Sequence, residues 1–149
     1  MSGHWFEDFF VGQEFRSSAM TITEASIIDF ALKYDPQPFH LDRREAEKSI
    51  YGGLIASGWQ MAAVTFGRFL SCHPFAHGAS LGAPGVDKLE WLHPVRPGDS
   101  VHVVVTVLDI RPSGSKPDRG VVRMEFELLN HEGTVVLRNT APLMVRRKA

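Results

Sequence analysis

Residues 54–70 are the longest apolar stretch of the chain and leave few options for its fold. Arg68 is the only charged residue among them, so a helix here would carry apolar side chains on most faces and must be surrounded by other structure. Polar and small residues interrupt the stretch too often for a membrane span. We therefore expect a buried central helix over 54–70 and no membrane partner.

Most of the sequence after this stretch has the pattern of β-strands. Residues 101–110 are rich in valine, and residues 121–129 alternate apolar with mostly charged side chains. A turn at 130–133 leads into a last strand over 134–145. Weaker strand patterns cover 13–22 and 86–92. One buried helix beside such strands predicts an α+β domain with an antiparallel sheet wrapped around one long central helix.

The size and charge of the chain limit its organisation and its partners. The 149 residues, 44% of them apolar, predict a single domain over 1–149, with 1–11 as an N-terminal arm packed on its surface. Lys and Arg total 16 against 17 Asp and Glu, so we expect no nucleic-acid partner. Cys72 is the only cysteine, and no secretory signal precedes the domain. Both observations favour a cytoplasmic protein.

A stiff loop precedes the apolar stretch. A helical pattern capped by Thr23 ends near Tyr34, because Asp35 comes before a proline and the proline ring disfavours α geometry there. Gln37 also comes before a proline. We therefore expect a rigid loop from Asp35 to His40, followed by a short helix through residues 42–48.

Asp35 and His40 are residue types suited to general acid and base chemistry near neutral pH. Two prolines between them lower the entropy lost in fixing both side chains around one small volume. Two such groups can hold and activate one water molecule. The same spacing also fits a surface turn in which Asp35 caps the loop and His40 is an ordinary polar residue.

Gly52 and Gly53 stand immediately before the apolar helix predicted over 54–70. Amide N–H groups at a helix start point outward and favour negative charge, so they can stabilise an oxygen on which charge develops. A simple helix entry with a permissive backbone explains the glycines equally well. Ser57, one turn later, is either a support for Asp35 or a ligand, or only a small packing residue.

Other chemistry has little support in the sequence. His73 and His77 are four residues apart but flank the irregular region around Pro74, and no cysteine or carboxylate cluster completes a metal site. The chain contains no glycine-rich phosphate loop and no Gly-x-Ser-x-Gly motif. We expect neither a metal nor a cofactor.

The run from residue 31 to residue 42, ALKYDPQPFHLD, resembles the hydratase motif of MaoC-like dehydratases. These are the (R)-specific enoyl-CoA hydratases of the hotdog superfamily. The family pattern is an Asp, one residue, an Asn, a Pro, an apolar residue and a His. Asp35, Pro38, Phe39 and His40 match this pattern, and Gln37 replaces the Asn.

Two later segments extend the resemblance. Residues 52–59 resemble the start of the family's central helix, although Gly52 stands where many members have His. Residues 94–99 resemble the family's turn into a long strand. The resemblance thus runs in matching order from about Gly12 to Val145.

The resemblance implies a hotdog domain that forms a homodimer or a higher homo-oligomer. It implies that Asp35 and His40 activate the water that adds across, or leaves, the 2,3 double bond of an enoyl thioester of fatty acid metabolism. Gly53 would donate its amide to the thioester oxygen, with Gln37 and Ser57 supporting the loop and the substrate. Coenzyme A would enter only as part of the acyl-CoA substrate.

Two other functions fit the same resemblance. A hotdog thioesterase would use the same water against the thioester carbonyl, although the proline-framed motif is the hydratase pattern. A non-catalytic acyl-CoA-binding hotdog protein is the other alternative, and the departures at Gln37 and Gly52 would fit it.

Overall fold

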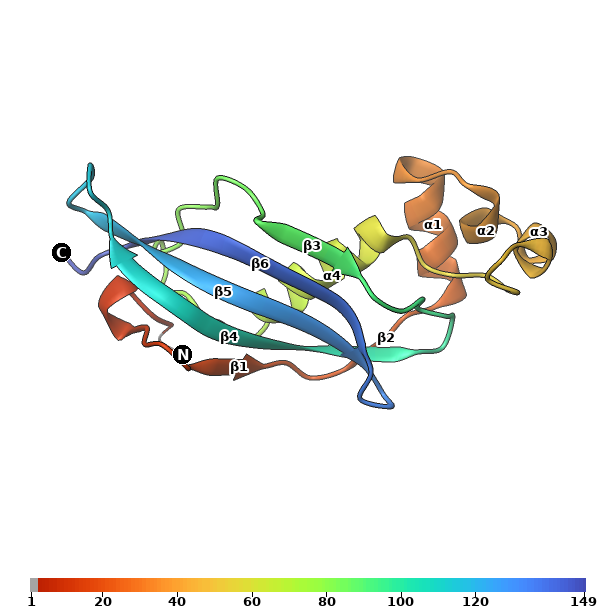
Figure 1. Cartoon of the computed structure of the whole chain (residues 1–149), viewed down its shortest axis with the longest axis horizontal. Helices are drawn as coiled ribbons and strands as arrows, with labels where there is room; N and C mark the ends of the chain where they lie inside the picture. The colour runs from red at the N-terminus through yellow and green to blue at the C-terminus, as the bar shows by residue number, and fades with distance from the viewer. Residues whose placement is uncertain (1–2) are drawn as a thin grey trace.

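The computed structural model describes residues 3–149 and is built on one antiparallel sheet of six strands (Figure 1). The main path across the sheet is β1–β4–β5–β6–β3, and β2 also pairs with β4. The strand bounds are β1 Glu14–Arg16, β2 Met20–Thr21, β3 Lys88–Trp91, β4 Ser100–Pro112, β5 Arg119–Asn130 and β6 Val135–Arg146. The three long predicted strands are confirmed, and the weaker pattern over 86–92 contains the short edge strand β3.

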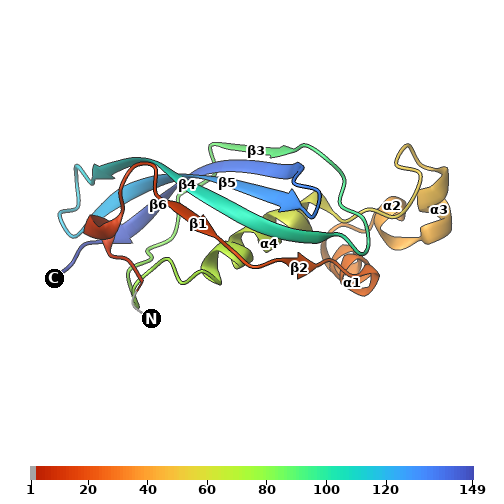
Figure 2. The ribbon, with the colours of Figure 1, turned by 90° about the horizontal axis from the view of Figure 1, so that it is seen from below.

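The central helix α4, Gly58–Leu70, runs along one face of this sheet (Figure 2). Alternate residues of β5 are buried, as a strand with one face toward a core requires. The rings of Phe69 on α4 and Phe126 on β5 meet edge to face, with centroids 5.2 Å apart. The turn after β5 places Gly133 at a φ of 81°, which a glycine adopts without strain. The predicted sheet around a helix is confirmed.

The central helix begins later than the sequence pattern predicts. Residues 54–57 lie outside it, and the backbone N–H groups of Ile55 and Ala56 instead donate to the backbone oxygens of Phe39 in α2 and of Val95. Ser57 is the N-cap of α4, because its side chain accepts the N–H of Trp59. The prediction was wrong here because a buried non-helical segment and a buried helix are both continuously apolar. Within residues 3–149, no helix is long and apolar enough to cross a bilayer.

Three helices gather beyond one end of the sheet: α1 Glu24–Tyr34, α2 Pro38–Leu41 and α3 Arg43–Lys48 (Figure 1). Thr23 caps α1 by accepting the N–H of Ser26, which confirms the predicted start of that helix. Asp42 caps α3, so the predicted short helix is also confirmed. These helices sit beside the first turn of α4 and enclose the region where the candidate site lies.

The stretch predicted as a stiff loop from Asp35 to His40 is only partly a loop. The prediction holds for residues 35–37, but Pro38 opens the short helix α2, and His40 lies within it. Proline is well suited to the first helical position, since its fixed φ is already helical and its missing N–H would have no intrahelical acceptor. The two prolines therefore end one helix and begin the next.

The N-terminal segment contributes to the core rather than packing on the surface as predicted. It contains a short 3-10 helix, Phe6–Asp8, and both Phe6 and Phe9 are buried in the main core cluster. Aromatic side chains in this segment fill the end of the sheet opposite α1–α3 (Figure 1). The first two residues of the predicted arm lie outside the described part of the chain.

Candidate functional site

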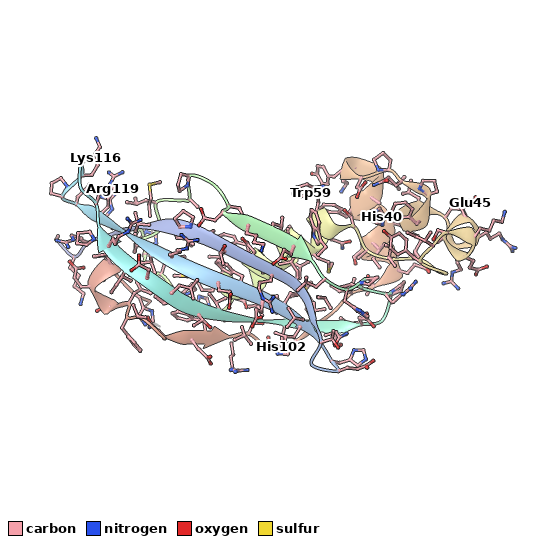
Figure 3. The ribbon with its side chains drawn as sticks, viewed as in Figure 1. His40, Glu45, Trp59, His102, Lys116 and Arg119 are labelled. Carbon is pink, nitrogen blue, oxygen red and sulfur yellow. The ribbon has the colours of Figure 1, made fainter. Side chains whose placement is uncertain are left out.

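A cavity of about 400 Å³ lies beyond the C-terminal end of α1, between α2, the first turns of α4, and the segment that follows β3. Asp35 and His40 both line it, so the structure brings the two predicted acid–base residues into one pocket. Figure 3 labels His40 and Trp59 at this junction. The remaining lining residues are Gln37, Phe39, Tyr51, Ile55, Ala56, Gly58, Met61, Trp91, Leu92, His93, Pro94, Val95 and Val136.

His40 is buried and has a defined tautomer. Its Nδ1 lies 2.7 Å from the backbone oxygen of Ile55. A carbonyl oxygen only accepts, so Nδ1 carries a proton and donates it. Nε2 then faces Asp35, with 3.2 Å between Nε2 and Oδ2. An unprotonated Nε2 and a carboxylate oxygen are both acceptors and would repel each other. One proton therefore lies between them, bonded either to Nε2 or to Oδ2.

Asp35 is held by two further donors. The hydroxyl of Ser57 donates to Oδ2 at 2.7 Å, and the side-chain amide of Gln37 donates to Oδ1 at 2.6 Å. Burial by itself raises the pKa of the Asp35 carboxyl. The two hydrogen bonds and the nearby His40 outweigh burial, so the pKa of Asp35 lies below its ordinary value. The surroundings of Asp35 therefore favour its ionised form.

Ser57 connects the reacting carboxylate to the central helix. It is fully buried, and its one hydroxyl donates to Asp35 while accepting the N–H of Trp59 at 3.2 Å. The start of α4 thus fixes the orientation of Asp35. Of the alternatives left open by the sequence, the structure places Ser57 against Asp35. Gln37 likewise contacts the carboxylate directly, despite having one methylene more than the Asn of the family motif.

Gly53 does not lie where the sequence predicted. Since α4 begins at Gly58, the amide of Gly53 is not at a helix start. Gly53 lines a second, more open hollow of about 270 Å³, next to Arg96. Gly58 lines the main cavity instead. The first amides of a helix have no intrahelical acceptor, and the hydroxyl of Ser57 already takes that of Trp59. The amide of Gly58 is therefore the better candidate donor.

The aromatic residues of the pocket were not predicted from the sequence. Trp59 and Trp91 line it from α4 and β3, and their rings meet edge to face with centroids 5.0 Å apart. Tyr51 and Phe39 add two more rings. A signal for the start of the helix was present, because Ser57 is a strong N-cap residue. No local pattern places Trp91 beside α4.

These features define what the site can do chemically. A carboxylate and an imidazole lie within hydrogen-bonding distance in a pocket with an apolar floor, which is also lined by Gly58, the first residue of α4. A water bound to both Asp35 and His40, beside their direct contact, can give up a proton to one group and receive one from the other. An oxygen that gains negative charge near Gly58 meets the positive end of a helix.

Known proteins of similar sequence belong to the family that the motif at residues 31–42 resembles. Residues 8–126 match the family model described as the MaoC like domain. An (R)-specific enoyl-CoA hydratase of Rhodospirillum rubrum is 33% identical over 147 residues, which cover 95% of this chain and 92% of that protein.

Solved structures show the fold. A MaoC-like dehydratase from Rhodospirillum rubrum superposes with a TM-score of 0.88, at 42% identity and with 99% of each chain covered. A Mycobacterium tuberculosis protein with a double hotdog fold aligns over 98% of this chain and 45% of its own, with a TM-score of 0.78. At 18% identity that match shows the fold alone. The predicted hotdog architecture is confirmed.

Proposed function

Because the chain belongs to the family of MaoC-like domains, we propose that it hydrates the 2,3 double bond of an enoyl-CoA, or catalyses the reverse dehydration. The observation that carries this proposal is the contact between Asp35 and His40 inside the cavity, with 3.2 Å between Oδ2 and Nε2. The similar Rhodospirillum rubrum protein is an (R)-specific enoyl-CoA hydratase, which supports a coenzyme A thioester as the substrate.

In the hydration direction, one water bridges Asp35 and His40. The Asp35 carboxylate takes a proton from this water as the oxygen forms a bond to C3 of the enoyl thioester. The π electrons of the double bond move to C2 and onto the thioester oxygen. His40 delivers its Nε2 proton to C2, and the proton on Asp35 then passes to His40, which restores the starting state. The net change is the addition of one water.

The amide of Gly58 stabilises the thioester oxygen as it becomes negative. This replaces the role that the sequence suggested for Gly53, whose amide is not at the helix start. Gly58 lines the cavity, and the first amides of a helix and its positive dipole end favour negative charge, which supports this role. Gln37 and Ser57 hold Asp35 ionised and oriented but need not touch the substrate.

The chain works as a homodimer. Among residues 3–149, strand β3 pairs only with β6, so one of its edges is available to pair with another strand. On α4, Phe66 and Leu70 are more than 40% exposed, and an apolar surface of this kind is one that a second copy could cover. Light scattering on the purified protein should give twice the mass of the chain, and a monomer at working concentration would contradict the dimer.

A spectrophotometric assay tests the function directly. Crotonyl-CoA loses its enoyl absorbance on hydration, while thiol release would identify a thioesterase. The wild-type protein should hydrate crotonyl-CoA without releasing thiol, and Asp35→Asn should lower turnover by about 10²–10⁴ while remaining folded. Thiol release would instead support the thioesterase, and binding without turnover would support an acyl-CoA-binding protein.

A further inference from the structure

Two tryptophans form an aromatic wall at the mouth of the cavity. Trp59, in the first turn of α4, and Trp91, at the end of β3, are 58% and 47% exposed, whereas the floor residues are nearly inaccessible. Their rings are almost perpendicular, with an interplanar angle of 80°. Figure 3 shows Trp59 beside the start of α4, on the side of the helical end that carries His40. We call this pair the tryptophan wall.

The wall is fixed to the backbone of the proposed carbonyl-binding turn. The indole Nε1–H of Trp91 donates to the backbone oxygen of Gly58 at 2.7 Å. The ring of Trp91 also lies directly on the α-carbon of Gly58, because a Cβ added there would come within 2.5 Å of the indole. Trp91 is therefore held against the residue whose amide faces the thioester oxygen. A substrate bound for reaction must lie beside this wall.

The opposite end of the cavity has an apolar floor. Ile55, Met61 and Val136 line it and are each at most 6% exposed. A volume of about 400 Å³ lies near the lower end of the range of about 300–1,000 Å³ that small-molecule pockets span. The thioester, the two alkene carbons and the attacking water occupy part of this space, which favours a small acyl group.

We propose that Trp59 and Trp91 are specificity-determining residues that restrict the substrate to short or compact acyl groups. An acyl group longer than the cavity is deep would have to turn back toward the mouth, where the rings of Trp59 and Trp91 lie. This inference rests on the proposed hydratase function and adds the size of its substrate. The apolar floor offers no partner for a charged or strongly polar acyl group.

The test compares trans-2-enoyl-CoA substrates of four, eight and twelve carbons with the wild type and Trp59→Ala. The wild type should prefer the four-carbon substrate in kcat/KM by about tenfold or more over the twelve-carbon one. Trp59→Ala should reduce that preference by about tenfold, because it removes an exposed ring without opening the core. Phe10→Ala removes an equally exposed aromatic ring away from the cavity and should leave the preference unchanged.

Binding of saturated acyl-CoAs, which cannot be hydrated, separates the two proposals. Affinity should fall with chain length in the wild type and fall less in Trp59→Ala. Equal affinity for four and twelve carbons, or an unchanged preference in Trp59→Ala, would overturn the size restriction while leaving the hydratase function intact. If affinity depends on chain length in this way but no enoyl-CoA is hydrated, the role of the tryptophan wall is supported and the hydratase function is contradicted.

Discussion

Replacing Ser57 with alanine tests two roles of this side chain, because it holds the Asp35 carboxylate and caps helix α4. The Ser57 hydroxyl donates to Asp35 at 2.7 Å and caps α4 by accepting the N–H of Trp59. A hydrogen bond to a charged group contributes about 1.5–3 kcal/mol, and losing an N-cap costs about 0.5–2 kcal/mol. The energy of the hydrogen bond to Asp35 affects the orientation and ionisation of that carboxylate, whereas the energy of the N-cap affects folding.

We therefore expect two measurable losses in Ser57→Ala. If the contact with Asp35 is fully used in the transition state, kcat for crotonyl-CoA hydration falls by roughly 10–100-fold, at about 1.4 kcal/mol per factor of ten. The melting temperature falls by about 2–4 °C for each kcal/mol lost from the cap. Enzyme assays and thermal unfolding followed by circular dichroism measure the two effects separately.

Thr23→Ala is the matched control. Thr23 caps α1 through a bond of 3.1 Å to the N–H of Ser26 but does not contact Asp35. It should lower the melting temperature by a similar amount and leave kcat nearly unchanged. If Ser57→Ala behaves like Thr23→Ala, with lower stability and full activity, then Ser57 is only a cap and the account of Asp35 is wrong.

Three other substitutions have defined outcomes. Gln37→Leu removes a donor to Asp35, so the pKa of that carboxyl rises and the acid limb of the kcat/KM profile moves to higher pH; an unmoved limb would contradict this role. Asp35→Asn removes a group whose pKa is lowered by folding. The stability that this group provides is present above the unfolded pKa of about 3.8 and disappears as the pH falls through the folded pKa, so urea unfolding of the variant should depend less on acid pH than that of the wild type. Gly58→Ala forces a Cβ against Trp91 and should cost about 1–3 kcal/mol of unfolding free energy and most of the activity. An alanine at Gly53 would meet only the movable end of the Arg96 side chain. If Gly53→Ala and Gly58→Ala lowered stability and activity equally, Gly58 would not be the carbonyl donor.

Local patterns predict the parts of this molecule that depend on neighbours in sequence. The prolines at 36 and 38 end one helix and begin another, and this local stiffness brings Asp35 and His40 together. The alternation along β5 likewise identifies its buried face. Such features follow from steric limits and periodicity, which act over a few residues.

Contacts between distant segments could not be predicted in this way. Apolar residues 54–57 look like the start of a helix, but their backbone N–H groups donate to Phe39 and Val95, and the helix begins only at Gly58. The contact of Trp91 with Gly58 joins residues 33 positions apart. A single sequence contains no record of such pairings, so the position of the carbonyl donor and the tryptophan wall required the structure.

A double-mutant cycle on the proposed pair tests the central claim, that Asp35 and His40 act together on one water. Turnover of crotonyl-CoA would be measured for the wild type, Asp35→Asn, His40→Gln and the double variant, with circular dichroism confirming that each is folded. If the two residues form one unit, the double variant should be about as slow as the slower single variant. A double variant whose loss equals the product of the two single losses would show that the residues act independently and would contradict the mechanism.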